Sequence, residues 1–328
     1  MPPRVWPAHE LVAALTAPGE PEVAGQVVLV DPPTRPIPPH DAAAAADRLA
    51  ALPCVVVGWP GWTPSDDLLP LVDVLPASDD EAIDVADAMA RHPRATLAAA
   101  VHLRGALRRT VADGLVAESA LYSALQGGPE HRRWRAGAPV RHGVAPAGPR
   151  IRVARHGDEL EISLARPQVR NALDAALRDE LLEALAVAEA DPALRVVLRG
   201  DGPSFCSGGD LDEFGTTPDP ALAHVIRLRR SIGLALHRLA DRTTVWVHGP
   251  CAGSGVELAA FAGRVVARPD ATFVLPELSM GLVPGAGGTV SLPARIGRHR
   301  TAWLVLTGRT IDAGTARSWG LVDEIDLI

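Results

Sequence analysis

FCSGGDL at residues 205–211 and GPCAGSGVEL at residues 249–258 are the two glycine-rich turns that decide the fold. Each turn follows a short apolar, β-branched run, at residues 196–198 and 245–247, and leads into a helical pattern. A strand, a glycine turn and a helix start, in this order, direct free backbone N–H groups at one point. Two such points that face each other would hold an oxygen atom on which negative charge develops.

Two glutamates accompany these turns. Glu257 closes the second turn, and Glu277 lies shortly before the glycine-rich segment GAGG at residues 285–288. The simpler interpretation of Glu257 is a carboxylate that caps an apolar helix, and that of Glu277 is an exposed turn residue. Asp210 is expected to have a structural role instead of a catalytic one. His248 is expected to be a packed side chain instead of a base. Cys206 and Ser207 have no neighbouring base in the sequence, which argues against a nucleophile.

The bulk composition bounds the class of protein. The 328 residues allow roughly two domains, and 47% hydrophobic with 22% charged residues is typical of a globular chain with a sizeable core. A net charge of -7 argues against nucleic-acid binding.

All 32 basic side chains are Arg, so a phosphate-loop lysine and a Schiff-base lysine are excluded. The 3 cysteines show no metal spacing, and no metal site is expected. The N-terminus lacks a signal-peptide core and no run could span a membrane, so the expected location is the cytoplasm.

The first part of the chain predicts a small β-α-β unit followed by helices. Strands are expected at residues 26–30 and 54–57 around a helix at 41–52 that Asp41 caps. Further helices are expected at 78–91, 95–107 and 111–125, and the basic segment 131–135 is either a solvated face or a contact to ligand phosphates. Residues 139–150 are rich in small residues and proline, which predicts a linker between a domain at 1–138 and a domain at 151–328.

The second part alternates strand and helix patterns, which predicts an α/β fold with a largely parallel sheet covered by helices. The strands are expected at residues 151–153, 160–164, 195–199, 243–248, 265–267 and 272–274. The helices are expected at residues 174–190, 224–240, 256–262, 288–296 and 301–307. The chain also repeats a phrase, because PLVDV at residues 70–74 is similar to GLVDEI at residues 320–325.

Five ordered motifs make residues 151–328 resemble the crotonase superfamily, the enoyl-CoA hydratase/isomerase family. They read RPQVRNAL at 166–173, FCSGGDL at 205–211, GPCAGSGVELA at 249–259, LPELSMGLVPGAGGT at 275–289 and LTGRTIDAGTARSWGLVDEI at 306–325. The resemblance implies a spiral of ββα units. It assigns the two oxyanion donors to the N–H groups of Gly209 and Ser254, and the two catalytic carboxyls to Glu257 and Glu277. It assigns coenzyme A (CoA) binding to two loops that contain Arg170, Ala172, Ser207, Gly208, Asp210 and Leu211.

The same resemblance implies acyl-CoA chemistry through a thioester enolate, most simply hydration of trans-2-enoyl-CoA to 3-hydroxyacyl-CoA. Double-bond isomerisation, thioester hydrolysis and C–C bond reactions use the same oxyanion pocket and are alternatives. A non-catalytic acyl-CoA-binding subunit is the alternative outside the enzymes. No cofactor is expected, because CoA is part of the substrate. The expected partners are the acyl-CoA thioester and further copies of this chain, as a trimer or hexamer, with no nucleic acid and no membrane.

Two departures from the family pattern bear on these expectations. Ser254 stands where the family usually carries glycine, which places a hydroxyl near the acyl group. The chain ends at residue 328, where the family continues into a C-terminal helical module, and residues 71–138 resemble that module. Residues 1–138 are therefore predicted to be a degenerate crotonase-like copy that kept its helices. We expect residues 78–135 to pack on the 151–328 core, either within one chain or swapped between chains, and to complete the acyl-CoA site. The core would otherwise leave a large apolar face in water.

Overall fold

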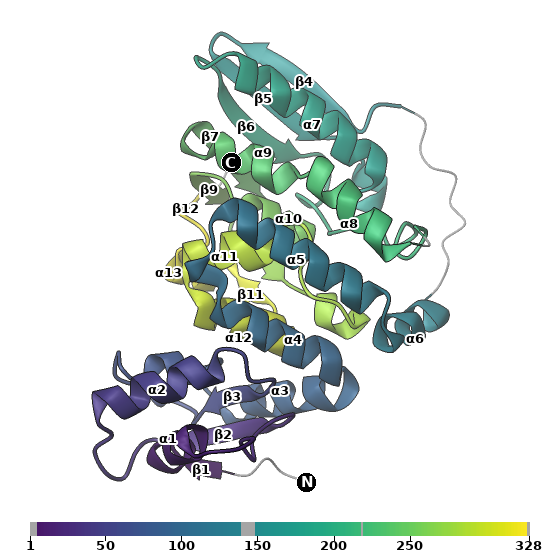
Figure 1. Ribbon diagram of the computed structural model, residues 1–328. Coiled ribbons are helices and arrows are strands. Elements are labelled where there is room, and N and C mark those ends of the chain that lie inside the picture. The colour runs from purple at the N-terminus through teal and green to yellow at the C-terminus, as the bar shows by residue number, and fades with distance from the viewer. Residues whose placement is uncertain (1–4, 139–147, 218, 327–328) are drawn as a thin grey trace.

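The structure is a computed structural model that describes residues 5–138, 148–217 and 219–326 (Figure 1). Its α-helices are α1 (Ala8–Thr16), α2 (Pro39–Leu49), α3 (Asp79–Arg91), α4 (Pro93–Arg104), α5 (Val111–Gln126), α6 (Pro129–Gly137), α7 (Ala175–Ala190), α8 (Pro220–Arg229), α9 (Ile232–Arg238), α10 (Ser254–Ala259), α11 (Gly288–Ile296), α12 (Arg298–Thr307) and α13 (Ala313–Trp319). Its strands are β1 (Val5–Pro7), β2 (Val27–Asp31), β3 (Val55–Gly58), β4 (Ile151–His156), β5 (Glu159–Leu164), β6 (Arg195–Gly200), β7 (Thr243–Val247), β8 (Pro250–Ala252), β9 (Arg264–Ala267), β10 (Thr272–Val274), β11 (Ile311–Asp312) and β12 (Glu324–Ile325).

A six-stranded sheet of order β12-β9-β7-β6-β5-β4 forms the largest layer. Its neighbouring strands are parallel except for the hairpin of β4 and β5. The apolar β-branched runs that indicated strands lie at its centre, in β6 and β7, where residues 196–198, 245 and 247 are buried. Buried parallel strands of this kind need helices on the sheet faces, and α7 packs on β4 and β5 with α9 beside it. The predicted α/β class with a largely parallel sheet is confirmed.

A smaller sheet of order β11-β10-β8 explains how the chain winds into a spiral. β7 lies in the large sheet, the next strand β8 lies in the small sheet, and α10 follows. The same sequence recurs with β9 in the large sheet, β10 in the small sheet, and α11 after them. Each repeated unit therefore places one strand in each sheet and then a helix, as a spiral of ββα units requires.

The N-terminal segment forms its own parallel sheet, β1-β2-β3, with α1 and α2 as crossovers and a separate small apolar core.

One backbone-to-aspartate hydrogen bond of this sheet has an equivalent in the large sheet. Asp73 accepts a hydrogen bond from Val56 N at 2.9 Å, and Asp323 accepts one from Val265 N at 2.7 Å. Each aspartate follows the repeated Leu-Val phrase and is also bound by an arginine, Arg104 or Arg295. The two phrases therefore form the same local structure.

The helices α3 to α6 lie against the core of the same chain. Figure 1 shows α4 and α5 running across the middle of the molecule, and α4 contacts α12 while α5 contacts α8 and α11. One continuous apolar core joins these helices to the large sheet. The packing expected for residues 78–135 is therefore present within a single chain. Of the predicted linker, residues 139–147 lie outside the described residues, and the division into domains at 1–138 and 151–328 stays a prediction.

Several predicted details differ from the structure. α2 begins two residues before Asp41, so Asp41 lies in its first turn instead of capping it. The helix expected at 224–240 is two helices, because the Ser231 side chain accepts a hydrogen bond from Leu234 N at 3.2 Å and starts α9. The basic segment 131–135 lies within α6, and β1 with α1 was not predicted. Within the described ranges, no helix is both long enough and apolar enough to cross a membrane.

Candidate active site

The first glycine turn is held in place by a short parallel bridge to Leu173. Leu173 N donates to Gly208 O at 2.8 Å, and Asp210 N donates to Leu173 O at 2.9 Å. In a parallel bridge, the residue between the two bonded groups directs its own N–H to the opposite side. Gly209 is that residue, so its N–H points away from Leu173 and is available to a ligand.

The second glycine turn presents the start of α10. Ala252 N donates to Cys206 O and Gly253 N donates to Val274 O, each at 3.0 Å, which fixes the turn between its neighbours. Ser254 is the first residue of α10, and the first N–H groups of a helix have no partner within the helix. The N–H of Ser254 is therefore a second available donor, with the positive end of a helix dipole behind it.

The two turns touch each other. A Cβ atom placed on Gly208 would lie 3.2 Å from Ala252 O and 3.7 Å from Gly253 Cα. The Glu277 carboxylate also lies at this contact between the turns, because a Cβ atom on Gly253 would be only 2.5 Å from Glu277 Oε1. Gly253 has φ +48° and ψ −122°, a conformation that residues with a side chain rarely adopt. Glycine is needed here both for the backbone conformation and for the approach of the carboxylate.

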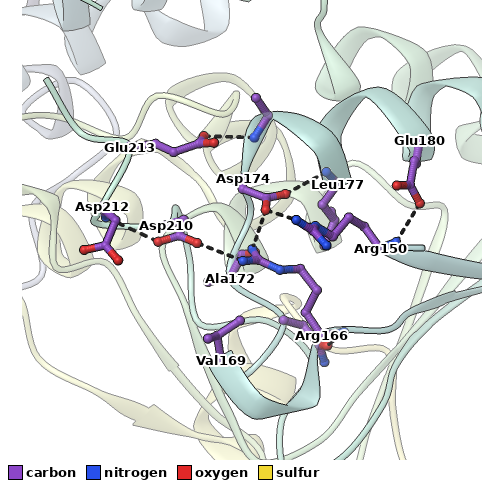
Figure 2. Close-up of polar contacts among 12 residues, drawn as sticks. Arg150, Arg166, Val169, Ala172, Asp174, Leu177, Glu180, Asp210, Asp212 and Glu213 are labelled. Atoms are coloured by element: carbon purple, nitrogen blue, oxygen red, sulfur yellow. Dashed lines mark hydrogen bonds and ion pairs between the residues drawn. The ribbon is translucent and has the colours of Figure 1, made fainter. Parts of the chain in front are cut away.

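A buried arginine fixes the loop beside the first turn. Arg166 binds Asp174 at 3.1 Å and Asp210 at 3.0 Å, and also donates to Ala172 O, as Figure 2 shows. Asp174 in turn caps α7 by accepting from Leu177 N at 2.7 Å. Asp210 therefore ties the first turn to this network, and its carboxylate is engaged in structure, as the sequence indicated.

Glu257 lies on α10 with its side chain 2% exposed. Its Oε2 atom accepts hydrogen bonds from Ala286 N at 2.7 Å and from Gly288 N at 2.8 Å, at the start of α11. Burial raises the pKa of this carboxyl to about 7, and the bonds from backbone N–H groups oppose that rise. The carboxylate does cap a helix, but the helix is α11 instead of its own.

Glu277 lies in a 3₁₀ turn (Glu277–Met280) and is 7% exposed. Burial raises the pKa of its carboxyl well above the ordinary value, and the charge of Glu257 raises it further. Its Oε2 atom and the Ser254 hydroxyl are buried without a hydrogen-bond partner among the described residues. Two unpartnered polar atoms of this kind are costly unless a ligand or a water binds them, and they are common at functional sites.

One cavity of about 390 Å³ joins these groups. Its lining includes five of the predicted site residues: Gly209, Asp210, Ser254, Glu257 and Glu277. α5 forms one wall and α8 another, so a helix that precedes the core in sequence helps to close the cavity. No group of three or more His, Cys, Asp or Glu side chains in the described ranges has the arrangement of a metal site.

The residues predicted to bind CoA lie on two adjacent loops. Ser207 N donates to Arg170 O at 2.9 Å, which joins these loops. Arg170 and Leu211 are exposed, whereas Ala172 and Gly208 are buried. The basic helix α6 packs against the segment that follows the second loop, with the Trp134 and Phe214 rings 6.1 Å apart.

The sequence predicted that helices of the segment 78–135 complete the site, but it did not identify the residues that α5 contributes. Glu118 and Tyr122 both line the cavity, and Glu118 is 2% exposed. The signal was present in the helical spacing, because Glu118 lies three residues after Leu115 and four before Tyr122, on the buried face. A carboxyl on the buried face of a helix needs partners, and those of Glu118 are on α11 and the turn before it.

The alternative nucleophiles near the turns are structural. Burial raises the pKa of the Cys206 thiol to about 11, which keeps it protonated at neutral pH. The Ser207 hydroxyl donates to Val169 O at 3.3 Å. His248 Nε2 contacts Gly202 O at 2.9 Å and does not line the cavity. None of these three side chains is placed to attack a bound acyl group.

The fold and the site define a protein that presents two backbone donors and buried carboxyls to one cavity. The sequence pattern of the enoyl-CoA hydratase/isomerase family matches residues 158–327, about half of the chain. The chain belongs to this family, and the predicted crotonase resemblance is confirmed.

The chain is 35% identical over 175 residues to a 2,3-dehydroadipyl-CoA hydratase of Escherichia coli, across 53% of this chain and 68% of that protein. It is 33% identical over 172 residues to a 1,2-epoxyphenylacetyl-CoA isomerase of the same species, across 51% of this chain and 65% of that protein. The crystal structure of an enoyl-CoA hydratase from Thermoplasma volcanium matches 55% of this chain and 73% of its own, with a TM-score of 0.52 and 33% identity.

Proposed function

We propose that the chain hydrates a trans-2-enoyl-CoA thioester to the 3-hydroxyacyl-CoA. The observation that carries the proposal is one cavity lined by Gly209, Ser254, Glu257 and Glu277. Free backbone N–H groups are suited to the thioester oxygen, and buried carboxyls with raised pKa values are suited to proton transfer. Family membership and the hydratases among the relatives support the same reaction.

In the proposed reaction, one carboxylate removes a proton from a water molecule as its oxygen adds to C3 of the enoyl group. The electron pair of the double bond moves toward the thioester, whose oxygen becomes an enolate oxyanion. The N–H groups of Gly209 and Ser254 stabilise that charge without reorganising, because the turn and the helix start hold them fixed. The enolate then collapses as the second carboxyl donates a proton to C2.

The rest of the substrate is assigned to the neighbouring surface. The loops that contain Arg170 and Gly208 are proposed to hold the nucleotide part of CoA. Arg132, Arg133 and Arg135 of α6 are proposed to contribute positive charge to its phosphates, because α6 packs against Phe214, three residues after the second loop. The reaction needs no cofactor beyond the CoA that the substrate carries.

The test is the loss of the enoyl thioester absorbance when the full chain is added to a short trans-2-enoyl-CoA. Turnover that yields 3-hydroxyacyl-CoA, identified by mass, is the expected result. Binding of CoA esters without turnover of a panel of chain lengths would contradict the proposal and favour a non-catalytic acyl-CoA-binding subunit.

A second candidate is double-bond isomerisation, favoured by the different states of the two glutamates. Glu257 Oε2 is occupied by two backbone N–H groups, whereas Glu277 Oε2 has no partner among the described residues. A single free carboxylate oxygen is suited to carry one proton from C2 to C4 of a 3-enoyl-CoA. Conversion of a 3-enoyl-CoA to the conjugated 2-enoyl-CoA, with no water added, would reverse the ranking.

The chain is also proposed to form a homo-oligomer based on a trimer. Val116 on α5 and Leu222 and Val225 on α8 are large apolar side chains that are 46–50% exposed beside the cavity. Burial of such groups between copies would stabilise an assembly. Light scattering that gives the mass of a single chain at micromolar concentration would contradict this proposal.

A further inference from the structure

The turn that leads into α11 is held by two carboxylates at once. The N–H groups of residues 286 and 288 donate to Glu257 at 2.7 and 2.8 Å. The N–H groups of residues 287 and 289 donate to Glu118 at 2.7 and 2.8 Å. Four consecutive N–H groups therefore alternate between two glutamates, one from the core and one from the helical module.

Glu118 is the more fully bonded of the two. Its Oε1 atom accepts from Gly287 N, and its Oε2 atom accepts from both Thr289 N and the Thr289 hydroxyl, the latter at 2.7 Å. The Thr289 hydroxyl is in turn 2.9 Å from His102 Nε2 on α4. Both oxygens of Glu118 are thereby fixed, and a change in its position must move the turn.

We propose that Glu118 is a positioning residue for Glu257, acting through the turn 286–289 that both carboxylates hold. The inference rests on the proposed function of Glu257 as a catalytic carboxyl. Any displacement of Glu118 shifts the N–H groups of residues 287 and 289, and the peptide chain carries that shift to residues 286 and 288. The carboxylate of Glu257 then loses its fixed orientation toward the substrate.

The carboxyl groups of Glu118 and Glu257 also interact electrostatically. Burial, followed by the charge of Glu257, raises the pKa of Glu118 to about 8. Burial raises the pKa of Glu257 only to about 7, so Glu257 ionises first and its charge acts on Glu118. The other titratable groups that face Glu118 come from every element around it, and they are Glu277 on the 3₁₀ turn, Arg227 on α8, Tyr122 on α5, and His102 on α4 through Thr289.

A matched control is available in the same module. Glu130 is 4% exposed and accepts hydrogen bonds from Arg94 N at 2.9 Å and Ala95 N at 3.1 Å, at the start of α4. It is a buried glutamate that binds backbone N–H groups as Glu118 does, but it does not line the cavity. Glu130→Gln therefore measures the loss that follows from disturbing any buried cap of this module.

The kinetic experiment compares the full chain with Glu118→Gln, Glu118→Asp and Glu130→Gln over a range of pH. The glutamine at 118 presents an amide N–H₂ to a backbone N–H donor, so kcat should fall about tenfold or more, as expected when catalytic groups move by a fraction of an ångström. The loss should fall on kcat and leave KM within about twofold, because a displaced catalytic carboxyl does not weaken ground-state binding. Glu118→Asp keeps the carboxylate acceptors and should lose less rate than Glu118→Gln. A rate loss in Glu118→Gln no larger than that of Glu130→Gln, or a loss confined to KM, would overturn the proposal.

A second measurement does not depend on turnover. The folded-state pKa values of Glu118 and Glu257 are raised, so their contribution to stability is present below the ordinary carboxyl range and is lost as pH rises toward 7 and 8. The melting temperature of the unsubstituted chain should fall over this range more than that of Glu118→Gln. The double variant with Glu257→Gln should show a non-additive change at pH 8. Additive shifts would overturn the coupling, whereas absent turnover with non-additive shifts would overturn only the proposed reaction.

Discussion

Gly253→Ala is the most informative single substitution, because two costs can be worked out separately. The new Cβ atom would lie 2.5 Å from Glu277 Oε1, and ordinary contact begins at about 3.4 Å, so the carboxylate must move by about 0.9 Å. A displacement of about 1 Å in a catalytic group costs on the order of 10²-fold in rate. The backbone conformation at φ +48° adds about 1–3 kcal/mol of strain to the folded state.

Gly297→Ala is the matched control. Gly297 has φ +82°, so alanine there is strained in a similar way, but nothing lies within 4 Å of the added Cβ atom. We expect both variants to lose about 1–3 kcal/mol in the free energy of urea unfolding. Only Gly253→Ala should lose on the order of 10²-fold in kcat, while the affinity for free CoA stays within about twofold.

The assay is steady-state turnover of an enoyl-CoA by each variant, with unfolding curves measured under the same conditions. If Gly253→Ala retains a kcat within a few-fold of Gly297→Ala, the position of Glu277 relative to the second turn has no role in the reaction. A loss of CoA affinity as large as the loss of kcat would also refute the reasoning, because it would show a general collapse of the site.

Four further outcomes are expected. Glu257→Gln and Glu277→Gln should each lower kcat by roughly 10²-fold or more with CoA affinity nearly unchanged, and a normal rate in either would remove that glutamate from the mechanism. Ser254→Gly should retain activity if the backbone N–H alone is used, so a collapse in kcat would assign a role to the hydroxyl. Arg166→Met should lose about 3–5 kcal/mol in the free energy of unfolding, because two carboxylates lose their buried partner, and a loss below 1 kcal/mol would contradict this. A fragment without residues 1–138 should aggregate or be inactive, since it lacks one wall of the cavity, and a soluble, active fragment would refute that expectation.

The core site could be predicted from sequence because its geometry is local. A glycine turn between a strand and a helix places a backbone N–H within a few residues, so the two turns indicated an oxyanion site, and the family resemblance assigned its donors to Gly209 and Ser254. Glu257 is one helical turn after Gly253, and Glu277 follows a strand that pairs with β8. The structure places all four around one cavity, although their catalytic roles stay proposals.

Glu118 could not be assigned in the same way. Helical spacing puts it on the buried face of α5, but nothing within that helix says what the face is buried against. Its partners are 169 and 171 residues further along the chain, and only the tertiary structure joins them. The break between α8 and α9 was missed for a different reason. The apolar pattern continues through Ser231, whereas the Ser231 side chain caps the start of a new helix. A local sequence pattern predicts which residues of a helix are buried, but it does not predict which residues of other elements they contact.

The wall that α5 contributes to the cavity has a consequence for how the protein is made. A ribosome completes α5 long before it reaches α11, since 171 residues separate Glu118 from Thr289. Contacts between such distant positions form late and slow the folding of a domain. The apolar face of α5 must remain unaggregated during that interval, which is the period when chaperones bind nascent chains. Catalytic competence should therefore be gained in the last step of folding, after the two sheets of the 151–328 core have formed.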